Sequence, residues 1–277
     1  MSTYGCVIVG RNDNYGGHLK ERASYAINSC LLTYDEVIYV DWNSRGDDLI
    51  TSIKENLLKT GKLKCVIVSP DEHKKFTGHF QGAQPCSEVL GRNVGLRRLS
   101  TDFLISTNVD EINPQRRYIE QFVDNQLMVA VARRATTLDA VHRLGNYLQL
   151  DLIRDELLKI KLPQAWEVTR EPYSLVEWCG DLQIAHRDVW YKIKGFEETQ
   201  LGVGVHDSFV LRKAKEFGYR IEPSYDIPLW HMDHTKVSDY SEPCVPTSVD
   251  CLYGDFKGTD NSDNWGLVNY KFKEFII

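Results

Sequence analysis

The sequence predicts an α/β fold in which helices flank a mostly parallel, Rossmann-like central sheet. Its N-terminal half contains short apolar, β-branched runs that each end at Gly, Asp, Ser or Asn, as strands do where a sheet stops. Between the first three runs the apolar residues recur at helical spacing, so strands and helices alternate. Strands that are apolar throughout are buried on both faces, as in a parallel sheet covered by helices. Four such strands are expected, at residues 4–10, 36–41, 63–69 and 102–108.

The second half of the chain predicts further strands and helices. The run LMVAVARRA (127–135) predicts a strand, and residues 138–162 predict a long amphipathic helix that is interrupted near Gly145. Residues 174–196 predict a strand that leads into a short helix. The last forty residues are rich in turn formers and predict a loop-dominated extension.

A chain of 277 residues fits one α/β domain with a decorated C-terminal part. We expect a domain over residues 1–235, with a nucleotide-binding half at about 1–112 and an acceptor and catalytic half at 113–235. Residues 236–277 are expected to form an extension that packs on the same domain. No internal repeat is visible, and no Pro- or Ser-rich linker separates the two halves.

Composition narrows the class of protein and its compartment. The net charge of −6 argues against a general nucleic-acid binder, which is expected to be basic. The seven cysteines are an odd number, and Cys6 and Cys65 lie inside apolar strand-like runs, which favours a reducing compartment. No signal peptide or apolar run of about 18 residues is visible. We therefore expect a cytoplasmic enzyme or domain without a transmembrane segment.

Polar residues follow the predicted strands, at the edge where α/β sheets bind their ligands. Neither the glycine-rich turn of dinucleotide-binding folds nor the phosphate-binding P-loop occurs in the sequence. The strand ends instead suit binding of a nucleotide through its base and ribose, and of its diphosphate through a metal. The residues at these ends are Arg11, Asn12 and Asp13, then Asp41, Asn43 and Ser44, then Asn108, Asp110 and Glu111.

Several motifs, in this order, resemble those of nucleotide-sugar glycosyltransferases of the GT-A fold, family 2-like. They are CVIVGRND, EVIYVDWNS, RNVGLRRLSTDFLISTNVDEI and the block from GDLQIAHRD to EFGYRI, and they cover roughly residues 4 to 235. The last block is similar to the catalytic segment of β-1,4-galactosyltransferases, whose pattern is G-W-G-G-E-D. The resemblance implies a GT-A fold and inverting transfer of a sugar, with a UDP-sugar as the first candidate donor, to a hydroxyl of a glycan or glycoconjugate.

The resemblance also implies a divalent cation, Mn²⁺ or Mg²⁺. The family holds its cation on a D-x-D motif, and the corresponding triplet here is Asn108-Val109-Asp110. Asp110 supplies a carboxylate oxygen, whereas Asn108 keeps only a hydrogen-bonding oxygen for the ribose. The segment HTK resembles the family's HSR, so His234 is the third metal contact that the resemblance implies, with His231 as the runner-up.

Other interpretations of these residues remain open. His231 and His234 could form a structural zinc site with Cys244 and Cys251, or have no ligand role. The stretch NVDEI could instead be a strand-to-helix cap, because Asn and Asp are good N-cap residues.

Asp207 falls where the resembling family keeps its general base. An inverting reaction needs a carboxylate that takes the proton of the acceptor hydroxyl. Gly202 and Gly204 precede it and permit a loop that closes over the donor. His206 replaces the usual Glu, so the contact with the acceptor should differ. Asp207 could also be the N-cap of the following helix.

The remaining donor contacts are assigned from the same resemblance. Arg92 is expected on the diphosphate, with Asn93 as a second candidate, because a guanidinium donates paired hydrogen bonds to phosphate; a solvated helix face with Arg97 and Arg98 is the alternative. The first two strand ends, with Arg11, Asp13 and Asp41, are expected to hold the base and ribose. Asp181 is expected to contact the donor sugar, near Trp178 and Gly180.

Two other functions compete with a glycosyltransferase. A sugar-phosphate nucleotidylyltransferase would usually begin with a glycine-rich loop that ends in basic residues, and this chain lacks one. A non-catalytic nucleotide- or carbohydrate-binding domain is kept open by Asn108 and His206. The presence of both Asp110 and Asp207 speaks against it, because a mere binder has less use for a base.

Overall fold

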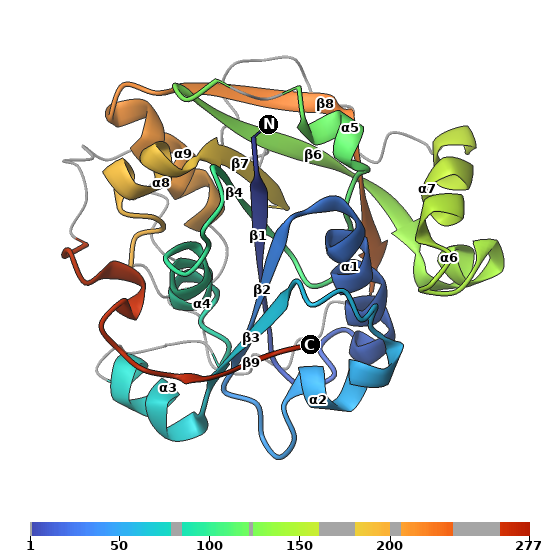
Figure 1. Ribbon diagram of the computed structural model, residues 1–277, viewed down its shortest axis with the longest axis horizontal. Coiled ribbons are helices and arrows are strands. Elements are labelled where there is room, and N and C mark those ends of the chain that lie inside the picture. The colour runs from blue at the N-terminus through green and yellow to red at the C-terminus, as the bar shows by residue number, and fades with distance from the viewer. Residues whose placement is uncertain (1, 79–84, 122–123, 161–180, 200–205, 235–260) are drawn as a thin grey trace.

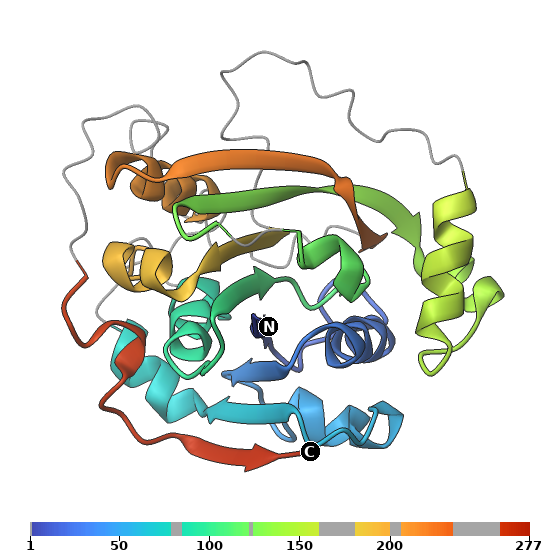
Figure 2. The same cartoon turned by 45° about the horizontal axis from the view of Figure 1, so that its top comes forward.

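A single nine-stranded sheet runs through the molecule in the order β5-β8-β6-β7-β4-β1-β2-β3-β9 (Figure 1). The structure is a computed structural model, and it describes residues 2–78, 85–121, 124–160, 181–199, 206–234 and 261–277. Helices cover the sheet on both faces, with α1 and α4 on opposite sides of the N-terminal strands (Figure 2). The predicted α/β fold with a largely parallel central sheet is confirmed.

The four predicted N-terminal strands form the parallel part of the sheet. They are β1 (Tyr4–Gly10), β2 (Glu36–Trp42), β3 (Leu63–Val68) and β4 (Phe103–Thr107). β1 lies between β2 and β4, and β2 pairs with β3, all in parallel. The register sets Gly10 opposite Asp41, so the polar residues that follow these strands meet at one edge.

The faces of β1 contribute to two separate hydrophobic cores. Cys6 and Ile8 pack on one side with α1 (Leu19–Thr33), and Val7 and Val9 pack on the other side with α4 (Glu88–Leu96). A Cβ on Gly95 would lie 2.1 Å from Val7 Cγ2, so only glycine lets α4 approach the sheet this closely. The sheet is thus buried on both faces, as its uniformly apolar strands predict.

Shorter helices complete this half of the fold. They are α2 (Leu49–Ile53), the 3₁₀ turn η1 (Lys54–Asn56) and α3 (Pro70–Thr77). A capping box starts α3, in which the Ser69 and Glu72 side chains each bond the other residue's backbone N–H, and Pro70 is its first residue.

The second half adds antiparallel strands to the same sheet. β7 (Leu182–His186) lies antiparallel between β4 and β6 (Leu127–Thr137), and β8 (Arg220–Asp233) runs parallel to β6. The short strand β5 (Glu111–Ile112) pairs antiparallel with β8. The helices of this second half are α5 (Arg116–Ile119), α6 (Leu138–Leu144), α7 (Leu150–Lys159), α8 (Arg187–Ile193) and α9 (His206–Glu216).

Several predictions for this half are confirmed and others need correction. The expected helix over 138–162 is interrupted at Gly145, and the strand before residue 187 leads into α8. The strand β8 was not predicted, because Pro223 and Pro228 weaken the strand pattern of its sequence. The stretch NVDEI is not a helix cap, since Glu111 belongs to β5 and α5 begins only after Gln115.

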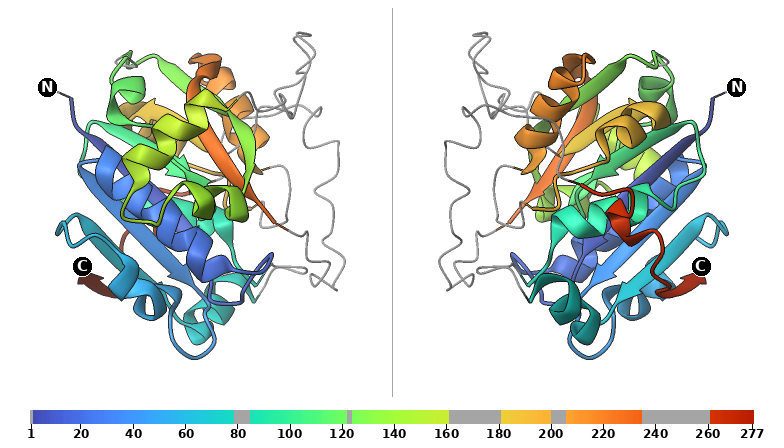
Figure 3. Two further views of the ribbon diagram at one scale, coloured as in Figure 1. Left: turned by 90° about the vertical axis from the view of Figure 1, so that its right-hand side faces the viewer. Right: turned by 90° about the vertical axis from the view of Figure 1, so that its left-hand side faces the viewer.

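The described end of the C-terminal extension, residues 261–277, contains a strand that a loop-dominated segment would lack. After the turn η2 (Trp265–Leu267), strand β9 (Lys273–Ile276) pairs antiparallel with β3 and forms the edge strand on that side of the sheet (Figure 3). Its sequence KEFI is short and half polar, as edge strands often are, and so gives little strand signal. Among the described residues, no helix is long and apolar enough to cross a membrane.

Candidate functional site

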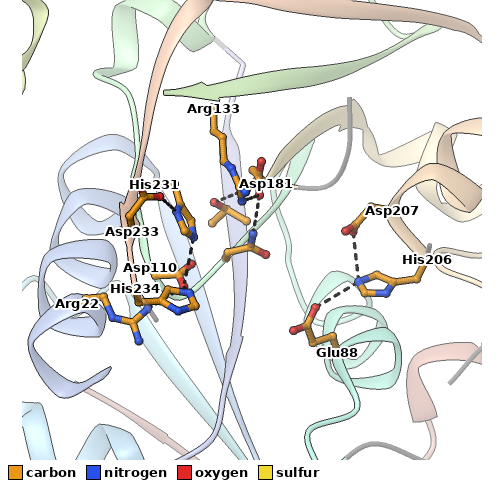
Figure 4. A network of polar contacts seen from close by, with 12 residues as sticks. Arg22, Glu88, Asp110, Arg133, Asp181, His206, Asp207, His231, Asp233 and His234 are labelled. Carbon is orange, nitrogen blue, oxygen red and sulfur yellow. Dashed lines mark hydrogen bonds and ion pairs between the residues drawn. The ribbon is translucent and has the colours of Figure 1, made fainter. Parts of the chain in front are cut away.

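Two clusters of polar side chains lie beyond the carboxyl ends of the parallel strands (Figure 4). We call Asp110, His231 and His234 the metal triad, and Glu88, His206 and Asp207 the His206 cluster. Between them lies a third group, which joins Asn108 to Asp181. The sections of chain that supply these residues are far apart in sequence, and the sheet brings them together.

Strand pairing assembles the metal triad. Asp110 directly precedes β5, and the antiparallel pairing of β5 with β8 sets Glu111 opposite His231. One ligand atom from each member of the triad lies within 4.8 Å of the others. Asp110 Oδ2 is 3.2 Å from His234 Nε2 and 3.7 Å from His231 Nε2. A carboxylate oxygen and two imidazole nitrogens at this spacing could hold a metal ion.

The charges around the triad keep its carboxylate ionised. Burial alone would raise the pKa of Asp110, but hydrogen bonds from His231 and His234 and the charge of Arg22 lower it well below its usual range. Burial lowers the pKa of His231, yet Asp110 and the hydrogen bond with Asp233 together raise it above its ordinary value. His231 Nδ1 lies 2.9 Å from Asp233 Oδ1. A proton shared there leaves Nε2, on the side of Asp110, free to bind a cation.

Arg22 also contacts the triad, although it was not predicted as a site residue. Its Nη1 donates a hydrogen bond of 2.9 Å to Asp110 Oδ2, and the residue is 1% exposed. It lies on α1, on the buried face that also carries Ala23 and Ala26. A charged side chain among small apolar residues of a buried helix is the one sequence signal that could have identified it.

Three of the predicted donor-binding residues are joined in one network. Arg92 donates from Nη1 to Ser106 Oγ at 2.6 Å and from Nη2 to Asn108 Oδ1. Asn108 Nδ2 in turn donates to Asp181 Oδ1 at 3.0 Å. Arg92 is buried, so it is not part of a solvated helix face. Its side chain orients Asn108, and through it Asp181.

Asp181 is also bound by a second arginine. Arg133 Nη1 donates to Asp181 Oδ1 at 3.0 Å. Burial raises the pKa of Asp181 to about 6, although Arg133 lowers it, and nearby Asp207 adds to the rise. This carboxyl group can therefore change protonation close to neutral pH.

The His206 cluster contains the predicted base. His206 Nε2 lies 3.2 Å from Glu88 Oε2 and 3.4 Å from Asp207 Oδ1. Burial lowers the pKa of His206, but Asp207 and Glu88 together raise it above its ordinary value. Partial burial would raise the pKa of the half-exposed Glu88, yet the contacts with His206 and Arg92 lower it to about 2. The imidazole is therefore held as a cation between two carboxylates.

Asp207 lies in the first turn of α9, as the second residue of the helix rather than before it. Its side chain is 22% exposed, so it is the more accessible partner of the buried His206. Gln183 Nε2, from β7, donates to the Asp207 backbone carbonyl at 3.0 Å. These contacts fix the start of α9 against the sheet.

The residues at the ends of β1 and β2 form a separate group. Arg11 donates to the Asn43 carbonyl at 2.9 Å and to Asp13 Oδ2 at 3.1 Å. Asp41 is fully buried, accepts a hydrogen bond of 2.7 Å from Leu49 N, and has its pKa raised to about 6 by burial. The structure brings Arg11 and Asp13 together and uses one oxygen of Asp41 to hold the start of α2.

Some expectations fall outside the described residues. They concern Trp178 and Gly180, the glycines Gly202 and Gly204, and the cysteines Cys244 and Cys251 of the zinc alternative.

Comparison with known proteins bears on the fold. No protein-family model matches the sequence, and no curated protein matches it. Among solved structures, the chain is similar to the mannosyltransferase PcManGT from Pyrobaculum calidifontis in complex with GDP-Man and Mn²⁺, with a TM-score of 0.52 and 15% identity. It is also similar to TarS from S. aureus, with a TM-score of 0.51 and 13% identity.

The matches cover most of this chain but a smaller share of each solved structure. They cover 86% and 83% of this chain, but only 59% of PcManGT and 37% of TarS. The chain thus spans less than two thirds of the proteins it matches. At such low identity the likeness speaks for the fold alone, and it shows that this chain has the GT-A fold of glycosyltransferases.

Proposed function

We propose that the protein is a metal-assisted, inverting glycosyltransferase. It moves a sugar from a nucleoside diphosphate sugar, with a UDP-sugar as the first candidate, to a carbohydrate hydroxyl of a glycan or glycoconjugate. The observation that carries the proposal is the convergence of Asp110, His231 and His234 within 4.8 Å at the ligand-binding edge of a GT-A sheet.

The residues of the metal triad fit a divalent cation. Mg²⁺ takes oxygen ligands almost exclusively, whereas two of the three groups here are imidazoles. Mn²⁺ accepts both kinds of ligand, and it is the ion named with PcManGT. When bound, such an ion would offset the charge that develops on the departing diphosphate.

The donor would be held by side chains on either side of the triad. Arg11 and Asp13 at the end of β1, with Asp41 at the end of β2, are proposed for the base and ribose, because α/β sheets bind ligands beyond the carboxyl ends of their strands. Asn108 offers a hydrogen bond to the ribose, and Arg92, which donates to Asn108, is the proposed contact of the diphosphate. Asp181 contacts the donor sugar, since its carboxylate can accept from a hydroxyl group.

Asp207 is the proposed general base. It takes the proton from the acceptor hydroxyl while that oxygen attacks the anomeric carbon from the face opposite the nucleotide. The cationic His206 lies 3.4 Å from Asp207 Oδ1 and holds this carboxylate in place. His206 is itself buried, so it offers the acceptor less surface than Asp207 does.

A non-catalytic nucleotide- or carbohydrate-binding domain is the competing proposal. Asn108 favours it, because this residue leaves a single carboxylate in the triplet where a cation is expected. Such a domain would bind a nucleotide sugar without releasing the nucleotide.

A donor-hydrolysis screen tests the proposal. The protein is incubated with UDP-, GDP-, dTDP- and CMP-sugars in Mn²⁺, Mg²⁺ or EDTA, beside Asp110→Asn, Asp207→Asn and the exposed control Asp139→Asn. We expect Mn²⁺-dependent release of one nucleotide, loss of release in Asp110→Asn, and wild-type behaviour in the control.

The base is tested by transfer to an acceptor found on a glycan array. Asp207→Asn should slow transfer to the acceptor by about 10²- to 10⁴-fold. Slow hydrolysis of the donor should persist, because attack by water does not require Asp207 to remove a proton from an acceptor hydroxyl. If no nucleotide is released and calorimetry detects no nucleotide binding, the glycosyltransferase proposal is wrong. Binding without release would favour the non-catalytic domain.

A further inference from the structure

We propose that Arg22 is a built-in cation that competes with the metal for Asp110, so that tight metal binding requires the nucleotide diphosphate. This inference rests on the proposed function, because it concerns the same metal triad. It assigns Arg22 a positioning and regulatory role rather than a catalytic one.

Three groups converge on a single oxygen of Asp110. Arg22 Nη1 lies 2.9 Å from Oδ2, His234 Nε2 lies 3.2 Å from it and His231 Nε2 lies 3.7 Å from it. The guanidinium is the nearest of the three, and Figure 4 shows it approaching Asp110 from the side of α1. A cation that binds the two imidazoles and this carboxylate must therefore share Asp110 with Arg22.

Arg22 cannot easily move away from the triad. Its Nη2 donates to the carbonyls of Tyr15 and, at 3.1 Å, of Gly17, and its Nε also donates to Gly17. Removing a buried guanidinium from these acceptors would leave the charge without partners, which is strongly unfavourable. The positive charge is thus a permanent part of the site.

The loop that holds Arg22 also touches a proposed metal ligand. Tyr15 packs edge-on against His234, with ring centroids 4.8 Å apart. A Cβ on Gly16 would lie 2.3 Å from His234 Nδ1 and 2.9 Å from Arg22 Nη2. The same short loop therefore fixes both the competing cation and one ligand.

The two ion pairs at and beside the triad are each neutral without a metal. Asp110 is offset by Arg22, and the nearby Asp181 is offset by Arg133. Asp233, behind His231, is 55% exposed and so is screened by water. A dication that enters this site is attracted by Asp110 but repelled by Arg22. A diphosphate adds negative charge that compensates both cations, so metal and nucleotide should strengthen each other's binding.

Calorimetry on the intact chain tests this coupling. Mn²⁺ alone, UDP alone and Mn²⁺ in the presence of saturating UDP are titrated into the wild type, Arg22→Gln, Arg22→Lys and Arg143→Gln. Arg143 is an exposed arginine of α6 and serves as the control. We expect UDP to tighten Mn²⁺ binding at least tenfold in the wild type, in Arg22→Lys and in the control.

Arg22→Gln should behave differently from all three. It should bind Mn²⁺ alone at least tenfold more tightly than the wild type and lose most of the coupling to UDP. If it binds Mn²⁺ alone no more tightly than the wild type, Arg22 only supports the fold and the inference is wrong. Thermal unfolding without metal shows whether each variant is folded.

The wild type alone provides a second test, should Arg22→Gln fail to fold. Equal Mn²⁺ affinity with and without UDP would overturn the coupling while leaving the proposed glycosyltransferase intact. If the wild type binds neither Mn²⁺ nor any nucleoside diphosphate, the proposed function itself fails, and this inference fails with it. The two failures are therefore distinguishable.

Discussion

At the scale of single residues, the nearest charged neighbour decides what each aspartate of the site can do. Burial raises the pKa of Asp41 to about 6, although hydrogen bonds from Ser44 and from backbone N–H groups lower it. Burial acts on Asp110 in the same direction, but two imidazoles and a guanidinium outweigh it. Of the two, only Asp110 lies beside imidazoles that could complete a metal site.

Glu88→Gln should lower the pKa of His206 and destabilise the protein within one pH window. Glu88, whose pKa is lowered from 4.5 to about 2, contributes stability that is present above pH 4.5 and is lost as the pH falls towards 2. His206, whose pKa is raised from 6.5, contributes stability that is full below pH 6.5 and is lost above it. The difference in unfolding free energy between the wild type and Glu88→Gln should therefore be largest between pH 4.5 and pH 6.5. NMR titration of the imidazole and urea unfolding at several pH values measure both effects.

The size of this effect is limited, because the Glu88 side chain is 49% exposed and solvent screens it. We expect a loss of about 1 kcal/mol at most. The matched control is Glu21→Gln, which removes an exposed glutamate beside His18 and His142. A Glu88→Gln variant in which the pKa of His206 is unchanged would show that Glu88 does not set the charge of the imidazole.

At the scale of elements, the loop between β1 and α1 is the part of the fold that touches the metal triad most closely. Its two neighbouring glycines both have positive φ, 68° at Gly16 and 74° at Gly17. Their surroundings differ, since a Cβ on Gly17 would meet nothing within 4 Å, whereas one on Gly16 would collide with His234. The same substitution at the two positions thus separates backbone strain from damage to the site.

Gly16→Ala and Gly17→Ala should each lower stability by about 1 to 2 kcal/mol, because an L-residue is strained at positive φ. Only Gly16→Ala should also displace His234 and weaken Mn²⁺ binding, by roughly tenfold or more, as expected for loss of one ligand's orientation. Urea unfolding and calorimetry with Mn²⁺ and UDP measure the two effects. Equal Mn²⁺ affinities in the two variants would mean that His234 is not a ligand.

At the scale of the whole molecule, the two halves expected from the sequence share one sheet and its cores. β4 pairs with β7, so the N-terminal strands continue directly into the second half. One core combines Cys6 and Ile8 with Val129 and Ile184, and the other combines Val7 with Trp190. Neither half can bury its apolar surface without the other.

A fragment of residues 1–112 should therefore fail to fold on its own. It would expose the edge of β4 and lose the apolar partners that come from β6, β7 and α8. We expect little cooperative unfolding by circular dichroism and a tendency to aggregate in light scattering, whereas residues 1–277 unfold with a clear transition. A soluble fragment with a sharp thermal transition would show that the nucleotide-binding half is an independent domain.

Local sequence patterns were sufficient to predict the class of fold and the regions where the candidate site lies. Uniformly apolar strands separated by helical spacing are local patterns, and they were enough to predict the parallel part of the sheet and the polar residues at its edge. Strands β8 and β9 were not predicted. Two prolines weaken the strand pattern of β8, and β9 is short and half polar, so both strands depend on pairing with their neighbours in the sheet.

Which of these polar residues meet depends on how distant strands and helices pack in the folded chain. The pairing of β5 with β8 sets Asp110 beside His231, and the packing of α1 on the sheet adds Arg22 to the same carboxylate. In the same way, α4 and α9 bring Glu88 to His206. Residue spacing along the chain carries no information about such contacts, because they arise from the order and direction of strands that are distant in sequence.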